Sequence, residues 1–133
     1  MVGGPGDAEG AWRSHNGIDW TQVSMSQSIE RFGLQVFAGS LYQYGGDSLG
    51  IISTNIVRFW QEGNGWTAWG KMPASLMNFG DTVCNGALWA IGGEYHSWNP
   101  GTEQPIHYYE NGVYKSTDAA TWEKVSTLSL IHI

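Results

Sequence analysis

Short runs of apolar and aromatic residues, each ended by a tight turn, follow one another along the chain. Residues 31–37 and 78–84 are two such runs that correspond position by position. Each continues through a turn into a second run, residues 41–44 or 88–91, that ends in Gly-Gly. Runs rich in β-branched and aromatic residues and bounded by Gly and Asn predict strands, and Asn85-Gly86 is a strong hairpin signal.

A third and a fourth strand are expected in each of these two units. The third covers residues 55–60 in one unit and about residues 106–116 in the other. The fourth runs from Trp66 to near Trp69, and from Trp122 to near Val125. Several strands are apolar on both faces, as in a sheet that is covered on both sides. No segment shows a sustained helical period, so the pattern predicts four-stranded antiparallel units.

A phrase made of an aromatic strand, a polar turn and a Trp occurs three times. Its copies are residues 12–20, 58–66 and 114–122, and Gly-Gly pairs at residues 3–4, 45–46 and 92–93 repeat in step with it. Repeats of about 50 residues that are built from strands indicate the blades of a β-propeller. We therefore predict an all-β fold with about two and a half four-stranded antiparallel blades.

The order of the motifs resembles a known family. Arg31-Phe32-Gly33, an apolar run, Gly-Gly, an aromatic third strand and a Trp are similar to the kelch repeat, which also builds the central domain of galactose oxidase-like proteins. Residues 14–20 and 116–122 resemble the Asp-box of sialidase-type propellers, shortened by one residue. The resemblance covers about residues 2–127 and implies a fragment of a kelch-type β-propeller.

We expect the chain to be a piece of such a propeller, with a half blade at residues 1–23 and blades at residues 24–69 and 70–127. Closed propellers have about four to eight blades, so the remaining blades of the same propeller are expected partners. Residues 128–133 resemble the translation of a transposase adaptor used in sequencing, and we expect them to derive from it. The alternative is an apolar linker into a following blade.

Charge and composition limit the kinds of partner. The formal net charge is −6, with 6 Lys and Arg against 12 Asp and Glu. This balance argues against nucleic-acid binding, which rests on clustered cations. No run is long and apolar enough to suggest a membrane segment. The compartment stays open, a secreted or extracytoplasmic location included. The one cysteine, Cys84, lies in a first strand and is expected to be a buried small hydrophobe.

The polar turns that precede Trp are expected to be structural. Side chains such as Asn16 and Asp118 can accept hydrogen bonds from the backbone of their own turns. Trp20, Trp66 and Trp122, which follow these turns, are expected to pack between sheets. Strand order places all these turns on one side of the propeller and the connections between second and third strands on the other.

The connection between Gly93 and Tyr114 is the stronger candidate for a binding site. It is longer than its counterpart at residues 47–54, and long loops with a composition of their own often carry function. Aromatic residues beside acidic ones suit sugar rings, which offer apolar faces and hydroxyl groups. The predicted ligand-binding residues of this loop are His96, Trp98, Glu103, His107 and Tyr108.

Metal binding and catalysis are not predicted. His96 and His107, with Glu94 or Glu103, offer metal-ligating atoms, but their spacing fits no established metal motif. No cofactor is predicted, and no Ser/His/Asp or paired-carboxylate arrangement stands out.

The catalytic residues of sialidases and of galactose oxidase, the two enzyme classes that the chain resembles, are not recognised in its sequence. Sialidases use several converging arginines, whereas Arg13 and Arg58 belong to third strands, away from the axis, and Arg31 fills a motif position. The copper chemistry of galactose oxidase needs a Tyr linked to a Cys, and Cys84 has no matching Tyr.

The predicted function is therefore that of a non-catalytic binding or scaffold fragment of a kelch-type β-propeller, whose ligand is a glycan or a protein. The alternative is a slice of a carbohydrate-active propeller enzyme, sialidase-like or galactose oxidase-like, with its catalytic residues in other blades. A third interpretation is that the reading frame has no function of its own.

Overall fold

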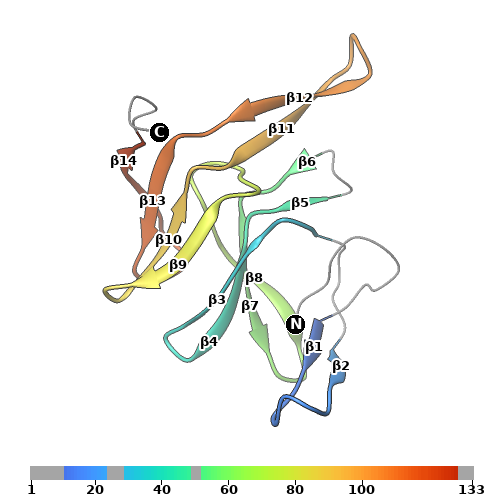
Figure 1. The fold of residues 1–133 in the computed structure, drawn as a ribbon, viewed down its shortest axis with the longest axis vertical. Helices are drawn as coiled ribbons and strands as arrows, with labels where there is room; N and C mark the ends of the chain where they lie inside the picture. Colours follow the sequence, from blue (N-terminus) through green and yellow to red (C-terminus); the bar gives the residue numbers. More distant parts are fainter. Residues whose placement is uncertain (1–10, 24–28, 49–51, 129–133) are drawn as a thin grey trace.

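A computed structural model describes residues 11–23, 29–48 and 52–128, and these residues form strands β1 to β14 and no helix (Figure 1). The described part of the chain accordingly contains no apolar helix that is long enough to cross a membrane. The architecture is all-β and consists of two four-stranded sheets and three two-stranded ones. The predicted fold class, a partial β-propeller with four-stranded antiparallel blades, is confirmed.

The two four-stranded sheets have the same construction. The first has the order β3-β4-β7-β8, with strands Gly33–Phe37, Ser40–Tyr44, Ile56–Gln61 and Gly65–Lys71. The second has the order β9-β10-β13-β14, with strands Gly80–Cys84, Ala87–Ile91, Gly112–Ser116 and Glu123–Thr127. All neighbours within each sheet pair antiparallel. Each sheet therefore has the strand order of one propeller blade.

Three two-stranded hairpins complete the fold. They pair β1 with β2 (Ala11–Arg13, Thr21–Val23), β5 with β6 (Asp47–Ser48, Ile52–Ser53), and β11 with β12 (Glu94–Asn99, Gln104–Tyr109). The second and third hairpins are inserted between the second and third strands of their sheets. Figure 1 shows both of them at the end of the molecule opposite the β1–β2, β3–β4 and β7–β8 turns.

The two sheets pack against each other around Tyr44, which is fully buried in β4. Its ring lies 5.6 Å from that of Phe79 and 5.3 Å from that of Trp122, centroid to centroid. Its hydroxyl donates to the carbonyl of Trp89 at 3.4 Å. Burial raises the pKa of Tyr44, and the nearby Asp81 carboxylate raises it further, so the hydroxyl keeps its proton and remains a donor. Tyr44 thus joins its own sheet to three parts of the next.

The Gly-Gly pairs let the chain pass close to the segment between the sheets. Gly46 has a φ of 93° and Gly93 a φ of 103°. The N–H of Gly46 donates to the carbonyl of Leu76 at 2.7 Å. A Cβ on Gly46 would lie 2.5 Å from the carbonyl oxygen of Glu30, and one on Gly93 would lie 2.8 Å from that of Met77. Only glycine fits both the conformation and the space.

Two local expectations are corrected by the structure. The third strand of the second sheet covers residues 112–116, and the preceding residues 104–109 belong to the separate strand β12. Cys84 is exposed, not buried. The reason is its place at the end of β9, which is the edge strand of its sheet, next to the β9–β10 turn.

Other expectations have mixed outcomes or fall outside the described residues. Trp122 packs between the sheets as predicted, whereas Trp20 is exposed. Trp66 packs edge-on against Trp60 of the same sheet. The first Gly-Gly pair at residues 3–4 and the adaptor-like residues 129–133 lie outside the described part of the chain.

Replacing Gly46 by Ala should destabilise the chain far more than the same change at Gly39. Both glycines have positive φ, but a Cβ on Gly39 would meet nothing within 4 Å. Gly39→Ala should therefore lower the free energy of unfolding by about 1 kcal/mol, the strain of a left-handed Ala alone. Gly46→Ala should lower it by about 3 kcal/mol because backbone must also move. Urea unfolding followed by circular dichroism measures both, and equal losses would contradict the close approach.

Candidate functional site

The loop that was predicted to carry the binding site is an ordered β-hairpin, β11–β12. Its turn forms at Asn99-Pro100-Gly101, where the Asn99 Oδ1 accepts a hydrogen bond from the N–H of Gly101 at 2.9 Å. Asn before Pro-Gly is a typical turn sequence, since the side chain of Asn mimics a backbone acceptor. Six residue pairs join the two strands. The candidate side chains are therefore held on a regular scaffold.

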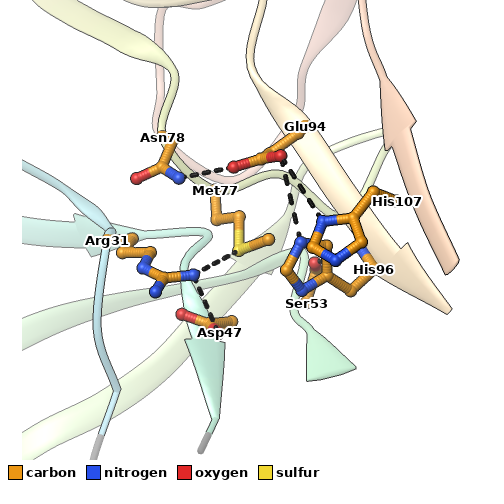
Figure 2. Close-up of polar contacts among 8 residues, drawn as sticks. All are labelled: Arg31, Asp47, Ser53, Met77, Asn78, Glu94, His96 and His107. Carbon is orange, nitrogen blue, oxygen red and sulfur yellow. Dashed lines mark hydrogen bonds and ion pairs between the residues drawn. The ribbon is translucent and has the colours of Figure 1, made fainter. Parts of the chain in front are cut away.

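Glu94, His96 and His107 come together on one face of this hairpin (Figure 2). His96 and His107 are cross-strand partners, and their ring centroids lie 3.8 Å apart. The Glu94 Oε2 lies 3.9 Å from the Nε2 of His96 and 3.9 Å from the Nδ1 of His107. His96 is buried, whereas His107 is exposed to solvent. The cluster thus has a fixed inner member and an accessible outer one.

Neighbouring elements hold this cluster in place. The N–H of His96 donates to the hydroxyl of Ser53 in β6 at 2.8 Å, which ties the two hairpins together. Asn78 donates from Nδ2 to the Oε1 of Glu94 at 2.6 Å, as Figure 2 shows. This bond leaves the other carboxylate oxygen turned toward the two histidines. The arrangement places one carboxylate oxygen beside two imidazole nitrogens, a set of groups that can ligate a cation.

An equivalent acidic residue occupies the same position in the first sheet. Asp47 follows Gly45-Gly46 as Glu94 follows Gly92-Gly93, and each pairs in an antiparallel bridge, with Glu30 and Met77 respectively. The Asp47 Oδ2 lies 3.8 Å from the Nη1 of Arg31, and Asp47 is fully buried. Arg31 in turn corresponds to Asn78, and the φ values of the two are 56° and 53°.

The pairing of the strands divides the predicted ligand-binding residues between two faces. Directly opposite residues of an antiparallel pair share a face. His96, His107 and Trp98 therefore lie on one face together with Tyr109, whereas Tyr108 lies on the other.

Tyr108 stacks on Tyr95 with ring centroids 4.7 Å apart, and Glu103 lies at the tip of the hairpin with a φ of 52°. The structure therefore brings three of the five predicted residues to one face and leaves the other two elsewhere.

Sequence reasoning missed two members of this region. Glu94 was considered only as a metal partner, although its position directly after Gly-Gly in the repeat marks it as the counterpart of Asp47. Tyr109 is the most exposed large apolar residue of the hairpin, at 86%. The period-two alternation of residues 104–109 would have placed it on the face of His107 had these residues been assigned to a strand of the hairpin.

The polar turns on the opposite side are built as predicted. The Asp118 Oδ1 accepts hydrogen bonds from the N–H groups of Thr121 at 2.7 Å and Ala120 at 2.9 Å. The Asn16 Oδ1 accepts from Ile18 and Asp19, each at 2.9 Å. The side-chain oxygens of Asp118 and Asn16 are therefore already hydrogen-bonded to the backbone of their own turns.

This side also carries an open hollow of about 310 Å³, lined by residues 115–118 and 121–123. Two of the polar groups in its lining, the Ser116 hydroxyl and the Asp118 carboxylate, are already bonded within the turn. These two groups therefore stabilise the turn itself.

Comparison with known proteins identifies the fold and nothing finer. No protein-family model matches the chain, and no curated protein matches it. Among solved structures, the structure of YjhT, which is of β-propeller type, matches with a TM-score of 0.68 at 14% sequence identity. The match covers 86% of this chain and 37% of the YjhT chain. At this identity the likeness concerns the fold alone.

Asp118→Ala should destabilise the folded chain in a pH-dependent way. Backbone N–H groups of Thr121 and Ala120 lower the pKa of Asp118 below its ordinary value. A lowered folded pKa means that the stabilisation is complete above the unfolded pKa of about 3.9 and is lost as the pH falls through the folded value.

Thermal melts at pH 7 should therefore show a loss of about 1 kcal/mol for Asp118→Ala, and the difference from the unchanged chain should shrink at acidic pH. Asp118→Asn is the matched control, because Asn16 accepts the same bonds in the first copy. This variant should keep most of the stability at pH 7 and lack the pH-dependent component. A pH-independent loss for Asp118→Ala would contradict the role of the carboxylate.

Proposed function

We propose that the chain is a segment of a kelch-type β-propeller and that the β11–β12 hairpin binds a glycan without catalysing a reaction on it. The observation that carries the proposal is the row of exposed side chains on one face of this hairpin. Trp98 is 45% and Tyr109 86% exposed, and His107 lies between them on the same strand-pair face.

The kelch assignment is supported by structural features that repeat in register. Both sheets place Gly-Gly at the end of the second strand, and both precede the first strand with a residue of positive φ, Arg31 or Asn78. The Phe of the motif, Phe79, packs on Tyr44 of the preceding sheet. Backbone geometry and packing thus explain why these residue types recur in the two sheets.

The hairpin face suits a sugar in its chemistry. A sugar ring presents C–H groups that pack on an aromatic ring, and Trp98 offers such a ring to solvent. Its hydroxyl groups need hydrogen-bonding partners, and the imidazole of His107 and the carboxylate of Glu94 are close by. The net charge of −6 disfavours a polyanionic glycan, so a neutral or cationic sugar is the expected class.

A carbohydrate-active enzyme that uses other blades for catalysis is the alternative, and a glycan-binding hairpin is compatible with it. Arg13 pairs with Glu62 at 2.6 Å and Arg31 lies 3.8 Å from the Asp47 carboxylate, so two of the three arginines are engaged with carboxylates of the chain itself. We therefore favour binding as the function of this segment.

Trp98→Ala should weaken glycan binding three- to tenfold, corresponding to about 1 kcal/mol for a lost ring contact. The chain is screened on a glycan array, and the affinity for the best ligand is measured by calorimetry. His107→Ala should also weaken binding. Tyr108→Ala is the matched control on the same hairpin, because Tyr108 is exposed to a similar extent but faces the other way.

Binding that is lost in Asp118→Ala but kept in Trp98→Ala would place the ligand on the opposite side and overturn the proposal, provided that both variants are folded. An equal loss of glycan affinity in Trp98→Ala and Tyr108→Ala would contradict binding on the Trp98 face of the hairpin.

A further inference from the structure

We propose that Glu94, His96 and His107 form a binding site for one divalent first-row transition-metal ion, of which Zn²⁺ fits the ligands best. This inference does not rest on glycan binding. The sequence spacing predicts no such site, because the ligands are brought together by the pairing of β11 with β12 and not by a local motif.

The three side chains converge on one point. Each offers one ligand atom, and these atoms all lie within 4.8 Å of one another. Both histidine nitrogens lie 3.9 Å from the Glu94 Oε2. In a tetrahedral zinc site with metal–ligand bonds of about 2.0–2.1 Å, ligand atoms lie about 3.3 Å apart. Each histidine–carboxylate distance must therefore shorten by about half an ångström, and the two histidine nitrogens must approach each other to the same spacing. Changes of side-chain torsion in Glu94 and in the exposed His107 can supply these movements without a shift of the backbone.

The site is organised by its surroundings. Asn78 donates to the Glu94 Oε1 at 2.6 Å and so directs Oε2 toward the histidines. The N–H of His96 points away from β12 to the hydroxyl of Ser53. His96 and His107 are thus a non-hydrogen-bonded pair, the kind in which cross-strand side chains approach most closely. Contacts that orient metal ligands in this way commonly raise metal affinity tenfold or more.

The chemistry of the ligands selects the ion. Two imidazoles and one carboxylate suit Zn²⁺ and related first-row ions, whereas Ca²⁺ and Mg²⁺ prefer sites made of oxygen ligands. Three protein ligands leave a fourth tetrahedral position open to water or to an added ligand. Exposure of His107 places that position within reach of solvent.

The test is calorimetric titration of the full chain with Zn²⁺, and with Ca²⁺ in parallel. Cys84→Ser serves as the common parent, because the exposed thiol of Cys84 is a competing zinc ligand. The parent should bind one Zn²⁺ and no Ca²⁺. Glu94→Gln and His107→Gln should each weaken Zn²⁺ binding at least about tenfold. His15→Gln, which removes an exposed histidine in the β1–β2 turn, should leave it unchanged.

A second measurement needs no variant of the site. Nitrogen-15 NMR of the histidine side chains of the parent should show shifts for His96 and His107 on addition of Zn²⁺, and none for His15. The proposal is overturned if the parent binds no Zn²⁺ at about 0.1 mM, if Glu94→Gln and His107→Gln bind as tightly as the parent, or if the shifts occur at other histidines only.

Discussion

The close passage of the backbone at Gly45-Gly46 is the constraint on which the rest of the structure depends. Here the chain leaves the second strand of a sheet and runs against the segment that leads to the next one, bonded to Leu76 on one side and to Glu30 on the other. A side chain at Gly46 would overlap the Glu30 carbonyl. The same close approach recurs at Gly92-Gly93. The same backbone conformation therefore sets the distance between each hairpin and the segment that precedes its sheet.

That passage also sets the position of the candidate site. The residue after each Gly-Gly pair is acidic and is held by an antiparallel bridge, so its side chain has a fixed origin. In the first sheet Asp47 is buried beside Arg31 and serves packing. In the second, Asn78 replaces the arginine and has no charge to neutralise Glu94, which leaves its carboxylate available to His96 and His107. The two equivalent positions thus hold an ion pair in the first sheet and a carboxylate beside two imidazoles in the second.

The sequence was sufficient for the sheets because their signals are local and repeated. Asn85-Gly86, the Gly-Gly pairs and the Trp turns each determine a backbone conformation through nearby residues, and the packing of Trp122 between the sheets follows from its place in the repeat. It was insufficient for the hairpin β11–β12, which is joined to the rest of the fold by the bridge between Glu94 and Met77 and by the bond between His96 and Ser53, contacts between residues far apart in the sequence. The register of β11 against β12 decides on which face of the hairpin each candidate residue lies. The sequence alone therefore assigns Trp98 and Tyr108 to one binding site, although their side chains lie on opposite faces. The exposure of Cys84 depends on which strand forms the edge, which no local pattern encodes.

Hydrogen exchange at the amides of the two bridges tests the central claim most directly. The N–H of Asp47 donates to the carbonyl of Glu30 at 2.9 Å, and the N–H of Glu94 donates to the carbonyl of Met77 at 3.0 Å. These two backbone hydrogen bonds hold Asp47 and Glu94 in place. Their amides, and that of Gly46, should exchange as slowly as those of the central strands β4 and β10. Rapid exchange at Asp47 and Glu94, while β4 and β10 stay protected, would show that the hairpins are not anchored to the sheets and would contradict the account.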